Sequence, residues 1–273
     1  MLKVRVIRAP NEWLEDFNFS EEYLAWVDGD VFTWWQRYPD VVPRYRYPMV
    51  WDNMAVCEFE SFDDWWKKVG KKTRNTVRKA EKRGVEVRVV KPDRDFFLGV
   101  TRIYNETPIR QGKYFRHYGV TFREVLEGYK RWLDERNVYI GAYWRGELIG
   151  FVHLVMTDKY WLMNQILSYV KHRDKTPNYA LVAEAVRYCS RTPLKRIVYG
   201  RMQSGDLGRF KMNVGFEKKL VPRYFIPLSR KGQLFIKLRL YKLPYVLLDS
   251  TPESLKPVIR PLSKLIFSDR FSL

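Results

Sequence analysis

Three apolar segments joined by very short turns lie in the middle of the chain, and they restrict its fold more than any other feature. They are VYIGAYW (138–144), LIGFVHLVMT (148–157) and YWLMNQILS (160–168). A turn as short as residues 145–147 joins antiparallel neighbours, because parallel strands need a long crossover connection. The sequence therefore predicts adjacent antiparallel strands and argues against a purely parallel sheet.

The strongest helix pattern covers residues 61–83. Ser61 is a favourable N-cap, and the acidic residues that follow it complement the helix dipole. Gly84 is a typical residue for the end of a helix. Side chains that recur every three or four positions predict one buried stripe, formed by Phe62, Trp66, Val69, Thr73, Val77 and Ala80.

The remaining segments show strand and helix patterns in turn. Residues 31–56, rich in Trp, Tyr and Pro, are expected to be irregular until a strand begins near 54, and RFKMNVGF (209–216) is expected to be a turn or short helix. Further strands are predicted at 2–8, 54–60, 85–90, 197–200 and 219–228, and helices at 93–108, 121–135 and 177–190. This order predicts an α/β (α+β) fold with helices on the faces of a mixed sheet.

The chain is strongly basic, with 50 Lys and Arg against 31 Asp and Glu and a formal charge of +19. An excess of this size favours a polyanionic partner. The alternative is a heat-adapted surface, whose charges need no such partner. Much of the charge falls on the helix at 61–83, where it indicates either a phosphate-binding surface or a solvated face. The candidate nucleic-acid-binding residues there are Lys67, Lys68, Lys71, Lys72, Arg74, Arg78, Lys79, Lys82 and Arg83.

Several classes of protein are disfavoured. No apolar run is long enough to span a membrane and the first residues do not resemble a secretion signal, so the expected location is cytoplasmic. Cys57 and Cys189 lie in apolar contexts, which indicates buried thiols rather than a disulfide or a metal site. The sequence shows no Ser–His–Asp triad, zinc cluster or Walker loop, and no metal is expected.

Two polar segments carry candidate catalytic residues. The segment YNETPIRQGKYFRHYG (104–119) holds Glu106 and His117, either of which could act as a base or serve only the structure. The segment GRMQSGDLGRFKMNVGFE (200–217) holds Lys211, which could face an oxyanion or a phosphate, or be a surface lysine beside a glycine-rich turn.

These segments together resemble GNAT-fold acyltransferases of the FemAB-like, peptidoglycan-bridge-type aminoacyltransferase branch. The resemblance covers about residues 50–227. It rests on the helix pattern within KKTRNTVRKAEKRGV, the hairpin AYWRGELIGFVHLV, and the helix NYALVAEAVRYCS followed by GRFKMNVGF. It implies a GNAT-like, mostly antiparallel central sheet with helices on both faces. It also implies a core at 61–228 and a basic, aromatic extension at 229–273. The N-terminal segment at 1–60 would be either a remnant half-module or a segment that completes the sheet of the one module.

By the same resemblance, Phe210 and Lys211 match a Phe-Lys pair whose lysine stabilises the tetrahedral intermediate of acyl transfer. The acyl donor would be acetyl-CoA or charged tRNA. The segment VKHRDKTPNYA (170–180) stands where the fold places a glycine-rich pyrophosphate loop, yet it has no glycine. The residues expected to bind the donor there are Lys171, Arg173, Lys175 and Asn178.

Two hypotheses from different classes follow. The first is an acyl- or aminoacyltransferase that acts on an amine with a phosphorylated donor. The second is a non-catalytic protein that keeps the fold and binds RNA, such as tRNA or the ribosome, through its basic surface. A homodimer fits either. A weaker alternative is attachment to anionic lipid through LRLYKLPYVLL (238–248).

Overall fold

The computed structural model describes residues 4–17, 21–243 and 267–269, and its chain forms two compact units. The first unit comprises the described parts of Met1–Met54, Arg201–Gly208 and Lys218–Leu273, and the second comprises Ala55–Gly200 and Arg209–Glu217. The strands β3 (Met49–Glu58) and β11 (Glu217–Pro227) each contain residues of both units. The N-terminal segment and the C-terminal extension therefore contribute to the same unit.

The second unit contains the central sheet that the three apolar segments predict. The strands follow the order β3-β10-β9-β8-β7-β4. All neighbours are antiparallel except β9 and β10, which are parallel. This confirms a mixed, mostly antiparallel sheet. The strands that have not yet been delimited are β4 (Val85–Val90), β7 (Asn137–Trp144), β8 (Glu147–Met156), β9 (Trp161–Ser168) and β10 (Arg196–Val198).

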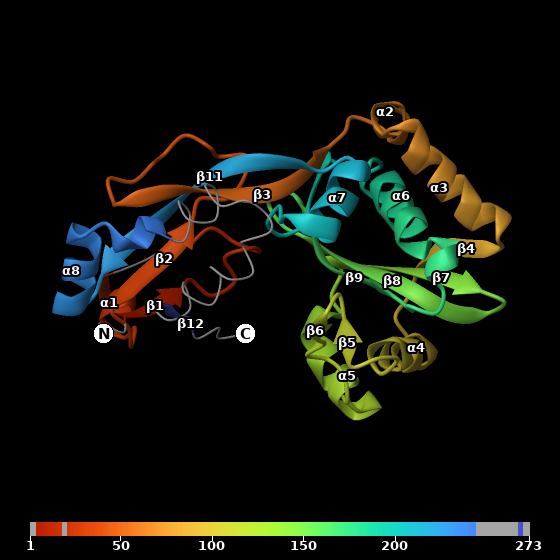
Figure 1. The fold of residues 1–273 in the computed structure, drawn as a ribbon, viewed down its shortest axis with the longest axis horizontal. Helices are drawn as coiled ribbons and strands as arrows, with labels where there is room; N and C mark the ends of the chain where they lie inside the picture. The colour runs from red at the N-terminus through yellow and green to blue at the C-terminus, as the bar shows by residue number, and fades with distance from the viewer. Residues whose placement is uncertain (1–3, 18–20, 244–266, 270–273) are drawn as a thin grey trace. The chain divides into compact units, whose positions relative to one another are not determined.

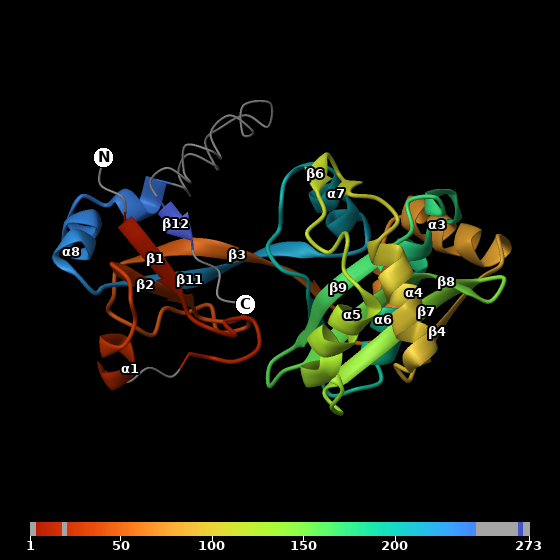
Figure 2. The ribbon, with the colours of Figure 1, turned by 90° about the horizontal axis from the view of Figure 1, so that it is seen from below.

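The turn between β7 and β8 has the left-handed backbone of a tight hairpin, with φ of 51° at Arg145 and 78° at Gly146. Helices cover both faces of this sheet, as expected: α3 and α6 lie on one face (Figure 1), and α4 and α5 lie on the other (Figure 2). They are α3 (Lys71–Lys82), α4 (Arg94–Tyr104), α5 (Phe122–Tyr129) and α6 (Pro177–Cys189). The short strands β5 (Ile109–Arg110) and β6 (Lys113–Tyr114) form a separate hairpin after α4.

The single helix expected at 61–83 is wrong, because two helices occupy the segment. The first, α2 (Phe62–Lys68), ends at Val69, whose extended backbone and the following Gly70 separate it from α3. Arg74 compensates for this break, since its Nη1 donates to the carbonyls that end α2. In α2 the buried side chain is Trp65 rather than Trp66, whereas Val69, Thr73, Val77 and Ala80 are buried as predicted.

The first unit contains strands that the sequence did not indicate. Residues 31–56 were expected to be irregular up to 54, which is wrong: β2 (Val31–Trp35) is fully buried and β3 already begins at Met49. A strand buried on both faces lacks the alternation that marks a half-exposed strand. The other elements of this unit are β1 (Val4–Arg8), β12 (Phe267–Asp269), α1 (Glu21–Ala25) and α8 (Arg230–Lys237).

The two cysteines, Cys57 and Cys189, are free and buried, as predicted. Burial raises the pKa of Cys57 to about 12, so its thiol stays protonated at neutral pH. Neither residue has the environment of a reactive thiolate.

Candidate functional site

The strands β9 and β10 separate in the middle of the second unit's sheet. Their pairing consists of Ile197 with Trp161 and Val198 with Leu162, although β9 continues to Ser168. On its other edge β9 remains paired with β8 along this length. The first residues of β9 are buried, whereas Asn164 is exposed and the remaining residues are partly exposed. The sheet therefore opens at an interior strand, and one edge of β9 becomes accessible.

Lys211 lies where this opening begins. It is carried by α7 (Gly205–Asn213), so the expected turn or short helix is a helix. Its Nζ donates to the carbonyl oxygen of Tyr199, one residue beyond β10, at 2.6 Å and lies 4.1 Å from the centre of the Tyr199 ring. Lys211 is only 1% exposed. Burial lowers the pKa of Lys211 to about 7, so both protonation states are populated near neutral pH.

The C-terminal end of α7 is attached to the helices α2 and α3. Trp65 donates from Nε1 to the carbonyl of Val214 at 3.0 Å, and Thr73 donates from Oγ1 to the carbonyl of Asn213 at 2.8 Å. Gly215, with φ of 90°, allows the close approach, because a Cβ there would lie 2.9 Å from Nε1 of Trp65. Gly215 and Phe216 follow soon after Lys211 in the sequence. This spacing has a structural reason, because the glycine lets the end of α7 pack against α2.

Phe210, the neighbour of Lys211, packs edge-on against Tyr179 of α6, with ring centres 5.2 Å apart. This contact joins α7 to the helix that follows β9. In the structure Phe210 therefore holds the element that carries the lysine.

Glu106 joins the segment after α4 to the end of β9. Its carboxylate accepts hydrogen bonds from the backbone N–H of Val170 at 2.6 Å and of Lys171 at 2.8 Å. Arg110 donates to the same carboxylate at 3.2 Å and to the carbonyl of Ser168 at 2.8 Å. Both carboxylate oxygens therefore help to hold the segment after α4 against the end of β9. These contacts account for Glu106 without a catalytic role. The carboxylate also occupies backbone amides just before α6, where the resemblance places the pyrophosphate loop.

His117 lies close to the accessible part of β9 through Tyr104. Its ring stacks on Tyr104 with centres 4.8 Å apart, and its Nε2 accepts from Nε of Arg116 at 3.0 Å. Burial and the charge of Arg116 lower the pKa of His117, so the imidazole is neutral. The hydroxyls of Tyr104 and Tyr129 each lie 2.7 Å from Oε1 of Gln165 on β9. These three polar residues were not among the sequence candidates, because their proximity depends on distant segments.

The residues expected to bind the donor lie around the N-terminus of α6. Lys171 reaches Glu147 at 3.4 Å, and Lys175 lies over the Trp144 ring at 4.3 Å. Arg173 is exposed, and Oδ1 of Asn178 is buried without a hydrogen-bond partner among the residues that the structure describes. The two lysines therefore contact different partners.

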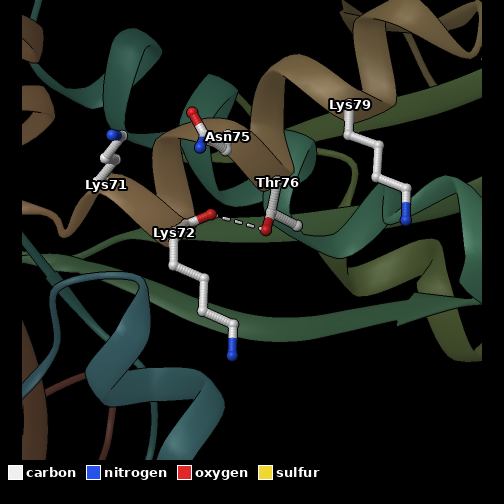
Figure 3. Close-up of a pocket in the computed structure, with 5 residues that line it drawn as sticks. All are labelled: Lys71, Lys72, Asn75, Thr76 and Lys79. Carbon is white, nitrogen blue, oxygen red and sulfur yellow. Dashed lines mark hydrogen bonds between the residues drawn. The ribbon is translucent and has the colours of Figure 1, made fainter.

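A surface hollow of about 430 Å³ lies beside this region on α3. It is lined by Lys71, Lys72, Asn75, Thr76 and Lys79. Figure 3 shows Lys72 and Lys79 extending from the same side of the helix. The N-terminus of α6 borders α3 here, since Oγ1 of Thr176 donates to the carbonyl of Thr76 at 3.0 Å. Three amines and a nearby helix N-terminus favour an anionic ligand at this surface.

The other basic candidates of α2 and α3 differ in their surroundings. Lys67 and Lys82 are exposed, whereas Lys68 pairs with Asp64 at 2.9 Å and Arg83 pairs with Asp174 at 2.7 Å. Arg78 lies 5.5 Å from the centre of the Trp66 ring. Arg74 is half-buried and its guanidinium is occupied by backbone carbonyls, so it does not present its charge as the exposed lysines do.

Within residues 4–17, 21–243 and 267–269, no group of three or more His, Cys, Asp and Glu could hold a metal ion. In the same residues, no helix is long and apolar enough to cross a membrane.

No family model and no curated protein matches the chain. Solved structures do match. FemX is 11% identical, with a TM-score of 0.51 over 76% of this chain and 68% of FemX. L-PGS from Bacillus licheniformis is 13% identical (TM-score 0.48; 72% and 67% covered). A tandem GNAT protein from the clavulanic acid biosynthesis pathway is 12% identical (TM-score 0.46; 74% and 65% covered). At this level of identity the comparison shows a shared fold: the chain has the fold of FemX over about three quarters of its length.

Proposed function

We propose that this protein is an acyl- or aminoacyltransferase whose reaction centre lies where β9 and β10 separate. The observation that carries the proposal is the place of Lys211: a buried amine with a pKa near 7, hydrogen-bonded beyond the end of β10 at the opening of the sheet. Exposed lysines of the same chain have no such environment.

The reaction would form a C–N bond and break the bond between the acyl carbon and the donor's sulfur or oxygen. An amine attacks the acyl carbonyl, negative charge develops on the carbonyl oxygen, and the donor leaves as a thiol or hydroxyl that takes up the proton lost by the amine. A protonated Lys211 would stabilise the oxyanion, because a charge in a water-poor site acts strongly on charge that develops nearby. The accessible edge of β9 would align the substrate through its backbone groups.

The donor would carry phosphate. In support, the hollow on α3 presents Lys71, Lys72 and Lys79 beside the N-terminus of α6, and α3 is attached to α7 through Thr73. Glu106 already occupies the amides of Val170 and Lys171, so the hollow is the more accessible anion site. Acetyl-CoA and charged tRNA both meet this requirement.

The test is transfer of a radiolabelled acyl group from acetyl-CoA, or from tRNA charged with labelled amino acids, to a panel of primary amines. Lys211→Met removes the charge with little change in volume, and it should lower the rate about 100-fold or more. Lys91→Met changes an exposed lysine and serves as the matched control. Unchanged transfer by Lys211→Met would show that the proposed role is wrong.

The second candidate function is RNA binding without catalysis, which the exposed amines of α2 and α3 favour. Lys67, Lys71, Lys72, Lys79 and Lys82 form no ion pair with any residue that the structure describes. RNA binding through them should weaken with salt, with a log–log slope of roughly −0.7 to −0.9 per phosphate contact. A Lys72→Glu, Lys79→Glu variant that binds short RNA as well as the native chain would exclude this surface.

A further inference from the structure

We infer that the outer face of α8 in the first unit is a docking surface for anionic lipid membranes. This surface, called the α8 face below, extends beyond the acyl-transfer function proposed for the second unit and does not depend on it. Figure 1 shows where α8 lies in the first unit.

The inner side of α8 is fixed to the core of its unit. Phe235 is completely buried with Val4, Val6 and Val31 of the neighbouring strands. Gly232 approaches β2 so closely that a Cβ would lie 1.9 Å from the carbonyl oxygen of Asp30. The helix is therefore held in place, and its opposite side must remain outside the core.

The α8 face combines apolar and cationic side chains. Leu234 is 45% exposed and Leu238 is 57% exposed, and they lie one helical turn apart. Residues 229–243 contain no Asp or Glu. The cations of this stretch form no ion pair with any other described residue, and they are Arg230, Lys231, Lys237, Arg239 and Lys242. The carboxylate of Asp30, with which Lys231 interacts electrostatically, is buried and accepts a hydrogen bond from Ser229.

Anionic lipid satisfies both parts of this surface. Leucine side chains enter the boundary between headgroups and acyl chains, while lysine and arginine remain among the phosphates. Single-stranded RNA fits less well, because it requires exposed aromatic rings for stacking. The aromatic residues of this stretch, Phe235 and Tyr241, are both buried.

The α8 face includes only the first residues of the segment 238–248, which the sequence offered as a lipid attachment. Residues 244–248 lie outside the described residues. The surface inferred here instead centres on α8, where helix geometry places the two leucines together.

The experiment is co-sedimentation of the full chain with vesicles of phosphatidylcholine, with or without phosphatidylglycerol. Binding is expected only to the vesicles that contain phosphatidylglycerol. Lys231→Glu with Lys237→Glu should weaken it on the order of 25-fold or more, since each cation near an anionic surface contributes about fivefold. Leu234→Ser with Leu238→Ser should weaken it about tenfold or more, because two apolar side chains are lost.

Matched controls change exposed residues elsewhere. Lys91→Glu with Lys113→Glu makes the same change in charge, and Leu133→Ser with Leu220→Ser makes the same change in hydrophobicity. If a control variant lost as much binding, the loss would reflect net charge or nonspecific hydrophobic adsorption, and the inference would be overturned. Absence of binding to either type of vesicle would also overturn the inference. So would binding that short RNA competes away and that Leu234→Ser with Leu238→Ser does not weaken.

Discussion

Two cations, Arg223 in the first unit and Lys211 in the second, are equally inaccessible at 1% exposure, yet their surroundings differ. Arg223 donates to Glu12 through both terminal nitrogens at 3.1 Å and to Asp52 through Nε at 2.8 Å. Lys211 donates to a neutral carbonyl, and burial lowers its pKa to about 7. A buried charge that carboxylates neutralise stabilises a core, whereas an amine whose pKa burial lowers to near neutrality can change its protonation in the working pH range.

The largest effect should come from breaking the neutralised cluster. Arg223→Met leaves Glu12 and Asp52 buried without their shared cation and is expected to lower the free energy of unfolding by about 3–5 kcal/mol. Urea denaturation would measure this loss. Lys211→Met is the matched comparison, and it should leave the stability at neutral pH equal or higher. Equal destabilisation by both changes would erase the distinction between the two sites.

Next in size is the effect of Lys211 on catalysis. If it acts as the proton-bearing partner of an oxyanion, Lys211→Met should cost about 100-fold or more in kcat/KM, equivalent to about 3 kcal/mol. In the native enzyme, kcat/KM should fall as the pH rises above about 7, since Lys211 then loses its proton. A rate that instead increases through pH 7 would indicate that Lys211 acts as a base.

Substitution of Glu106 tests whether its carboxylate only anchors neighbouring segments or also takes part in catalysis. Glu106→Gln keeps one acceptor for the amides of Val170 and Lys171 but removes the charge that faces Arg110. Local stability should fall by about 1–3 kcal/mol, measured as faster hydrogen exchange of these two amides. Glu127→Gln, which alters an exposed ion pair with Lys130, should leave them unchanged. A large rate loss without faster exchange would contradict the anchoring role.

The two units should also respond to pH in different ranges, Asp52 on the acid side and Lys211 on the alkaline side, with stability increasing as the pH rises in both. Burial would raise the pKa of Asp52, but Arg223 and Arg201 outweigh it and lower that pKa. The stability that Asp52 provides is therefore present at neutral pH and is lost as the solution becomes acidic. The pKa of Lys211 is lower in the folded than in the unfolded chain, so its contribution becomes more favourable from about pH 7 up to its usual value of 10.5, by at most about 1.4 kcal/mol per pH unit.

Thermal denaturation across pH would measure both trends. Asp52→Asn should remove part of the acid-side loss, and Lys211→Met should flatten the alkaline side. If stability still increases with pH on the alkaline side in Lys211→Met, another group must cause that increase.

The smallest effect is expected at the exposed amines. Lys72→Ala and Lys79→Ala should change the free energy of unfolding by no more than about 0.5 kcal/mol, because neither side chain is buried or ion-paired in the described structure. Their melting curves should match that of the native chain. A clear loss of stability would instead show that these lysines, like Arg223, have a structural role.

The sequence indicated the features that depend on nearby residues. The strands at 138–168 follow from local patterns and short turns, and they have the predicted positions. The positions of Glu12, Asp52 and Arg223 gave no such signal, because their contact joins residues separated by 171 and 211 positions. Similarly, the sequence marked Lys211 as a candidate, but the burial that lowers its pKa arises only when the part of α7 that carries it packs within the second unit.

The way β3 and β11 pass from one unit to the other has a consequence for synthesis of the chain. A ribosome that has reached residue 200 has produced most of the second unit, which lacks only Arg209–Glu217. The first unit has by then its opening 54 residues but not β11, the antiparallel partner of β2. Domains that are contiguous in sequence usually fold from the N-terminus onward. Here the first unit must wait, because β2 can pair with β1 but lacks its antiparallel partner until β11 (Glu217–Pro227) has been made.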